Sequence, residues 1–151
     1  MTVLLLGATG ATGRLLAEQL LARGLHVRAV VRAPERLPEG LRASDHLQVV
    51  AAGILDLSDP ELVDLVRGCE AVVSCLGHNL TWRGVFGHPR RLVTEAVRRL
   101  CLAVRAHSPE SPVRFALMST AGIRNRDLTE TTSPAERCVT GLLRLLLPPY
   151  S

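Results

Sequence analysis

Three glycines stand at intervals of three residues near the start of the chain, directly after an apolar run. They are Gly7, Gly10 and Gly13 in the segment LLLGATGATGRLL. Gly7 permits a tight turn off a strand, Gly10 lets a pyrophosphate approach the backbone, and Gly13 lets a helix pack close to the strand. That helix offers free N–H groups and a positive dipole end, and Thr9 and Thr12 add hydroxyl donors. The pattern predicts a dinucleotide site; the alternative is a purely structural turn between a strand and a helix.

Two arginines follow the next apolar run, where the ribose of a bound dinucleotide would lie. An acidic side chain at this place accepts hydrogen bonds from the ribose 2′-OH of NAD and repels the 2′-phosphate of NADP. The chain instead has Val31, then Arg32 and, one helical turn later, Arg36. Two guanidinium groups hold a 2′-phosphate through forked, charge-assisted hydrogen bonds. We therefore predict NADP(H), with NAD(H) as the less favoured cofactor; the alternative is that both arginines are ordinary solvated side chains.

Strand and helix patterns alternate, which places the glycine segment between the first strand and the first helix. Apolar runs predict strands at 2–6, 26–31, 47–51, 71–76 and 113–118, and amphipathic patterns predict helices at 13–23, within 56–68, at 89–106 and at 134–147. Residues 33–40 and 78–88 are predicted as loops. Continuously apolar strands separated by helices predict a parallel sheet covered on both faces. The expected fold is α/β: a Rossmann-type, doubly wound three-layer αβα domain over residues 1–151, with strand order 3-2-1-4-5.

The composition is that of an ordinary globular protein, and it disfavours several classes of function. Of the 151 residues, 47% are hydrophobic and only 3% aromatic, which argues against nucleic-acid binders that stack bases on aromatic rings. The net charge of +4 comes from scattered arginines, without any lysine. The histidines lack the spacing of a zinc site, and we expect no signal peptide or membrane span. The four cysteines form no C-x-x-C pair, so reduced, buried thiols in a cytoplasmic protein are expected.

Five segments together resemble the atypical short-chain dehydrogenases/reductases: GATGATG, VVRAPERLP, LDLSDPEL, VVSCLG and ALMSTAG. Among these proteins the chain looks most like the NmrA-like, NAD(P)H-binding group that includes biliverdin reductase B, a flavin reductase. The resemblance runs from Val3 to about Leu147. It implies that Asp56 meets the adenine amino group, that Leu57 flanks the ring, and that Leu76 and Gly77 approach the adenosine ribose. The cofactor-binding residues are then Gly7, Thr9, Gly10, Ala11, Thr12, Gly13, Arg32, Arg36, Asp56, Leu57, Leu76 and Gly77.

The usual proton relay of the wider superfamily is missing. That relay is a Tyr-x-x-x-Lys pair, whereas this chain has no lysine and its only tyrosine is Tyr150. The resemblance leaves Ser119 and Thr120 as catalytic candidates, with Thr120 matching the residue that faces the nicotinamide; the alternative is a hydroxyl that caps a turn. Hydride transfer remains compatible with this, because the cofactor carries the chemistry.

Two functions follow as expectations. The first is an NADPH-dependent reductase of a small, flat acceptor such as a flavin or a quinone. The alternative is a non-catalytic NAD(P)(H)-sensing module; a sugar-nucleotide epimerase or dehydratase is disfavoured by the missing Tyr-x-x-x-Lys pair. The chain also stops before the later strands of the family pattern. We therefore expect a C-terminal truncation and a sheet edge at the fifth strand that is exposed unless a second copy covers it.

Overall fold

The structure is a computed structural model that describes residues 1–76, 92–107 and 109–118. All described residues belong to one compact unit, Met1–Met118. The predicted loop at 78–88 and the predicted helix at 134–147 therefore lie outside the described residues. The expected single domain and the expected truncation stay predictions.

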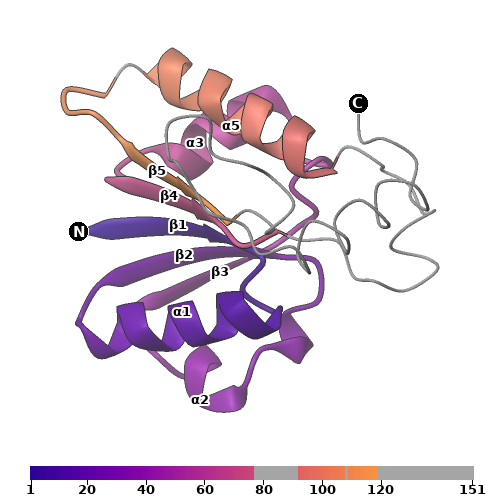
Figure 1. Ribbon diagram of the computed structural model, residues 1–151, viewed down its shortest axis with the longest axis vertical. Helices are drawn as coiled ribbons and strands as arrows, with labels where there is room; N and C mark the ends of the chain where they lie inside the picture. Colours follow the sequence, from indigo (N-terminus) through magenta and orange to yellow (C-terminus); the bar gives the residue numbers. More distant parts are fainter. Residues whose placement is uncertain (77–91, 108, 119–151) are drawn as a thin grey trace, which may run out of the picture. The chain divides into compact units, whose positions relative to one another are not determined.

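Strands and helices alternate along this unit, as the sequence pattern predicts (Figure 1). In chain order the elements are β1 (Thr2–Leu6), α1 (Ala11–Ala22), β2 (His26–Val31), the 3₁₀ turn η1 (Pro34–Arg36), α2 (Glu39–Arg42), β3 (Leu47–Ala51), α3 (Asp59–Val66), β4 (Ala71–Ser74), α5 (Leu92–His107) and β5 (Arg114–Leu117).

The five strands form one parallel sheet in the order β3-β2-β1-β4-β5, which confirms the predicted fold and strand order. Strand β1 is central: Leu5 pairs with Ala29 on β2 and with Val73 on β4. The strands β2 and β3 are added on one side of β1, and β4 and β5 are added on its other side, so the strand order reverses between β1 and β4. In open α/β sheets, ligands bind beyond the carboxyl ends of the strands at such a reversal, and the glycine segment follows β1 there.

Helices cover both faces of the sheet, α1 and α2 on one side and α3 and α5 on the other (Figure 1). Because side chains alternate along a strand, β1 contributes to two cores. Leu4 and Leu6 pack in the cluster that contains Leu62 and Leu100, and Leu5 packs in the cluster that contains Ala17. Every residue from Val3 to Leu6 is at most 2% exposed, so the strand before the glycine segment is anchored on both sides.

Several predicted boundaries need correction. Helix α1 begins at Ala11, before the predicted start at residue 13. The predicted loop at 33–40 contains η1 and the start of α2. Strands β4 and β5 are shorter than the apolar runs that predicted them. Cys69 and Cys75 are buried free thiols as expected, but Cys101 is exposed, because it lies on the outer side of α5.

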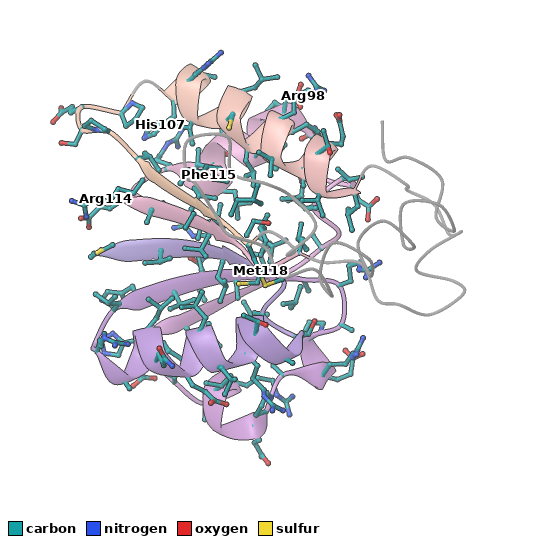
Figure 2. The ribbon with its side chains drawn as sticks, viewed as in Figure 1. Arg98, His107, Arg114, Phe115 and Met118 are labelled. Atoms are coloured by element: carbon teal, nitrogen blue, oxygen red, sulfur yellow. The ribbon has the colours of Figure 1, made fainter. Side chains whose placement is uncertain are left out.

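Strand β5 lies at one edge of the sheet in the part of the chain that the structure describes. All four of its residues are exposed, and Phe115 and Met118 lie along this edge (Figure 2). A second copy that covers the edge stays a prediction. No helix in the described ranges is long and apolar enough to cross a membrane.

Candidate functional site

The turn after β1 depends on Gly7. Its φ of +79° lies in the left-handed region, which glycine adopts without strain. A Cβ at this position would lie 2.7 Å from the carbonyl oxygen of Cys75 and 3.1 Å from the backbone nitrogen of Leu76. The turn therefore passes directly over the end of β4, which places Leu76 beside the glycine segment. Burial raises the pKa of the Cys75 thiol, which disfavours a thiolate nucleophile here.

The close packing of α1 against this turn depends on Gly13. A Cβ on Gly13 would overlap the carbonyl oxygen of Gly7 and would lie 2.7 Å from the Gly7 carbonyl carbon. Gly10 donates its N–H to the same carbonyl oxygen at 3.0 Å, and a Cβ on Gly10 would meet only that oxygen, at 3.3 Å. Gly7 thus forms the turn, Gly10 leaves the backbone without a covering side chain, and Gly13 allows α1 to pack against the turn.

Among the described residues, no side chain caps the N-terminus of α1. Gly10 occupies the N-cap position without a side-chain hydrogen bond, and the first turn carries no acidic residue. The first turn of a helix has N–H groups without intrahelical partners and a positive dipole end. Ala11 and Thr12 in that turn are exposed. The first turn can therefore accept an anionic group from outside the chain, and Thr9 lies beside it as a hydroxyl donor.

Helix α3 shows the opposite arrangement at its N-terminus. The Ser58 backbone N–H donates to the Glu61 carboxylate at 2.7 Å, and the Ser58 hydroxyl donates to the same oxygen at 2.6 Å. These two hydrogen bonds lower the pKa of Glu61. The capping box that the sequence contains therefore fills the start of α3 with an internal carboxylate.

Arg32 and Arg36 lie beyond the carboxyl end of β2, and both are exposed. Arg36 is the last residue of the η1 turn, and its backbone N–H donates to the carbonyl of Ala33 at 3.1 Å. Within the described ranges, neither arginine side chain makes a hydrogen bond or an ion pair. Both guanidinium groups therefore keep their hydrogen-bonding capacity for a ligand at this edge of the sheet.

Asp56 lies beyond the carboxyl end of β3, in a tight turn. Its backbone N–H donates to the carbonyl of Gly53 at 2.9 Å, and its carboxylate occupies the space that a side chain on Gly53 would fill. Asp56 is exposed and Leu57 is half-buried. The resemblance indicated Asp56 and Leu57 but missed Gly53, although the spacing G-x-x-D was a usable signal for it.

The structure thus places the adenosine-side and phosphate-side candidates of the sequence at the carboxyl ends of β1 to β4. The remaining candidates, Gly77, Ser119 and Thr120, lie outside the described residues.

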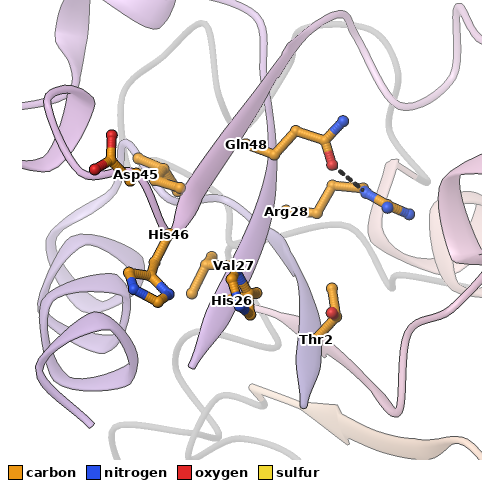
Figure 3. Close-up of a pocket in the computed structure, with 8 residues that line it drawn as sticks. Thr2, His26, Val27, Arg28, Asp45, His46 and Gln48 are labelled. Atoms are coloured by element: carbon orange, nitrogen blue, oxygen red, sulfur yellow. Dashed lines mark hydrogen bonds between the residues drawn. The ribbon is translucent and has the colours of Figure 1, made fainter. Parts of the chain in front are cut away.

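A shallow depression lies at the opposite ends of the strands and does not belong to this site (Figure 3). Its lining includes Thr2, His26 and Leu47, the first residues of β1, β2 and β3. The His26 and His46 rings stack there with centroids 4.5 Å apart. Because a parallel sheet binds ligands at its carboxyl edge, we assign this depression no part in cofactor binding.

Comparison with known proteins supports the assignment of the glycine segment. A family model described as NAD(P)H-binding matches residues 7–142. An uncharacterized chloroplastic protein of Arabidopsis thaliana is 36% identical over 73 residues, which cover 48% of this chain and 26% of that protein.

Solved structures of longer proteins share the fold. The UDP-glucuronic acid 4-epimerase of Bacillus cereus, in complex with UDP-glucuronic acid and NAD, gives a TM-score of 0.67 at 19% identity, over 94% of this chain and 49% of that one. The oxidoreductase ylbE of Lactococcus lactis gives 0.64 at 19% identity, over 95% and 57%. A short-chain dehydrogenase/reductase of Veillonella parvula in complex with NADP gives 0.59 at 16% identity, over 80% and 48%. At these identities the similarity establishes the fold alone, and the chain spans about half the length of these proteins.

Proposed function

Because the chain belongs to the NAD(P)H-binding family, we propose that it is an NADPH-dependent oxidoreductase that delivers hydride to a small, flat acceptor of the flavin or quinone type. The observation that carries the cofactor choice is the pair Arg32 and Arg36 beyond β2, exposed and without ion-pair partners among the described residues. The end of β2 carries Val31 and then Arg32 in place of an acidic residue, so the ribose edge favours a 2′-phosphate over a 2′-OH.

Each part of the site then has one role in holding the cofactor. The open first turn of α1 binds the pyrophosphate, and Thr9 and Thr12 add hydroxyl donors to it. Arg32 and Arg36 bind the 2′-phosphate, and Asp56 accepts a hydrogen bond from the adenine amino group. When bound, the cofactor supplies the hydride, so the chain has to bind and orient the two reacting rings.

The acceptor side of the site is proposed from the sequence resemblance alone. Leu76 and Gly77 would line the ribose, and Ser119 and Thr120 would face the nicotinamide. Without a Tyr-x-x-x-Lys pair, the proton that accompanies the hydride would come from solvent or from the acceptor itself. A flavin accepts a proton on a ring nitrogen and a quinone accepts one on a carbonyl oxygen, which is why this acceptor class fits the chain better than a sugar nucleotide. The free thiols of Cys69, Cys75 and Cys101 fit a reducing compartment such as the cytoplasm.

The experiment measures nucleotide binding first and turnover second. Titration with NADPH and NADH gives the two dissociation constants for the natural chain, for Arg32→Glu and for the control Arg42→Glu. Arg42 is an exposed arginine of α2, so its replacement makes the same charge change away from the proposed phosphate position. We expect Arg32→Glu to weaken NADPH about tenfold more than NADH, because a hydrogen bond to a charged group is worth roughly 1.5–3 kcal/mol. Equal loss for both nucleotides would refute the role of Arg32.

Turnover separates the reductase from a nucleotide-sensing module. Loss of NADPH absorbance is followed with a panel of flavins and quinones at saturating cofactor. Oxidation of NADPH that depends on the acceptor supports the reductase. Tight NADPH binding without turnover across the panel would favour the sensing module, for which the missing Tyr-x-x-x-Lys pair is the supporting observation.

A further inference from the structure

Arg99 joins helix α5 to the segment that follows β3. Its side chain is only 15% exposed. Nη1 donates a hydrogen bond to the carbonyl oxygen of Leu55 at 3.1 Å, and Nη2 donates to the carbonyl oxygen of Leu57 at 2.6 Å. Nη2 also lies 2.7 Å from Oδ1 of Asp59, in the first turn of α3. One guanidinium group therefore holds two carbonyl groups of the loop between β3 and α3 and the side chain of the first residue of α3.

The two carbonyls that Arg99 binds belong to the residues on either side of Asp56. The turn restrains Asp56 from within as well, since its N–H donates to the carbonyl of Gly53 and its carboxylate fills the space beside that glycine. The backbone before and after Asp56 and the place of its carboxylate are thus fixed together.

The backbone carbonyls account for most of this restraint. The Asp59 side chain is 86% exposed, and ion pairs of exposed partners contribute little. The two carbonyls are bound by a partly buried cation with a rigid fork of donors, which a lysine ammonium cannot reproduce. The chain therefore has a specific need for arginine at this position.

We propose that Arg99 is a positioning residue for adenine recognition: by holding the carbonyls of Leu55 and Leu57, it directs the Asp56 carboxylate toward the adenine amino group. The inference rests on the proposed function, because it takes the adenine of NADPH to lie beside Asp56. It adds a residue of helix α5 to a site whose other adenosine-side residues lie in the segments directly after β2, β3 and β4.

The test compares NADPH with its deamino analogue, in which an oxygen replaces the adenine amino group. A carboxylate that accepts a hydrogen bond from the amino group favours NADPH, and we expect the natural chain to prefer NADPH about tenfold. Asp56→Ala should abolish this preference. Arg99→Met should reduce it to near one as well, and Arg99→Lys should restore part of it. A purely structural role would weaken both nucleotides equally and leave the ratio unchanged.

Arg98 provides the matched control. It lies on the outer side of the same helix, where it pairs with Glu95 at 2.6 Å (Figure 2). Arg98→Met removes an arginine and an ion pair without touching the loop, so the preference should stay at the natural value. Gly53→Ala perturbs Asp56 from the other side and should lower the preference; if Arg99→Met fails to fold, this variant and Arg99→Lys carry the test.

The outcomes distinguish the inference from the function on which it rests. A preference that stays at the natural value in Arg99→Met or in Arg99→Lys, while Asp56→Ala loses it, overturns the role of Arg99. Tight NADPH binding without any preference in the natural chain overturns the inference but leaves the proposed cofactor standing. Failure to bind either nucleotide refutes the proposed function, and the inference with it.

Discussion

Replacing Gly13 with alanine tests whether the glycine segment is packed as tightly as the structure shows. On propensity alone the change should stabilise α1, since alanine is favoured over glycine in a helix by about 1 kcal/mol. The structure predicts the opposite sign. The added methyl group would overlap the Gly7 carbonyl oxygen and lie 2.7 Å from its carbon, whereas ordinary van der Waals contact begins at 3.4 Å. Both atoms are backbone and cannot move aside by rotating a side chain.

The magnitude follows from the cost of overpacking, which is about 1–3 kcal/mol in well-packed interiors. We expect a value in the upper part of this range, about 2–3 kcal/mol, because Gly7 is held by β1 on one side and by the end of β4 on the other. For a chain of this size the midpoint of thermal unfolding should fall by roughly 4–12 °C. NADPH affinity should fall as well, since α1 can escape the overlap only by moving its first turn away from Gly7.

Gly40→Ala is the matched control for this measurement. Gly40 lies in the short helix α2, where an added Cβ would have nothing within 4 Å. The same substitution should leave stability unchanged there or raise it by up to about 1 kcal/mol. Thermal and urea unfolding of both variants, with NADPH titration, give the comparison. Equal or higher stability of Gly13→Ala would refute the packing argument for the glycine segment.

Four further substitutions test other parts of the fold. Ser58→Ala should destabilise the chain by about 1 kcal/mol through loss of the N-cap. Because the pKa of Glu61 is lowered in the folded state, Glu61→Gln should lower the stability at neutral pH. Urea unfolding at several pH values should show this loss disappear as the carboxyl group is protonated below about pH 4.3. Arg28→Met should cost about 2 kcal/mol, since the guanidinium donates to the carbonyl of Leu65 at 2.5 Å near the end of α3; unchanged urea unfolding would contradict this. Ser74→Ala should be neutral or stabilising by up to about 1 kcal/mol, because the Ser74 hydroxyl is fully buried and has no hydrogen-bond partner among the described residues; a clear loss in the same assay would show that the hydroxyl is bound.

The parts of the fold that the sequence predicts well are those whose residues are neighbours in the chain. The strands at 2–6, 26–31 and 47–51 match the structure because each is a short, mostly apolar run between turn residues. Strand order then follows from the chirality of the crossovers. The sequence predicts the start of α1 at residue 13, later than its start at Ala11. Glycine is unfavourable in helices, so the pattern gives no signal that Gly13 already lies in the first helical turn.

The contacts that shape the site most closely join residues far apart in the chain. Arg99 and the carbonyl of Leu55 are 44 positions apart, and no local pattern links them. The close approach of Gly7 to Cys75 has the same character, since it exists only because β1 and β4 are neighbours in the sheet. The sequence therefore indicates which residue types serve the cofactor, but the residues that position them become visible only when the strands are paired.

The two helix N-termini at the carboxyl edge of the sheet show how the chain separates binding from stability. Helix α3 begins at Asp59 after the N-cap residue Ser58, whose backbone N–H donates to the Glu61 carboxylate, so an internal acceptor stabilises this helix start. Helix α1 begins with Gly10, without a capping side chain or an acidic residue, so it gives up that stabilisation. We infer from this contrast that the first turn of α1, beside a turn that only glycine fits, is available to an external anion. If the proposed nucleotide binds there, its phosphate should stabilise α1 in the way that Glu61 stabilises α3, and we expect nucleotide binding to raise the stability of the first βαβ unit.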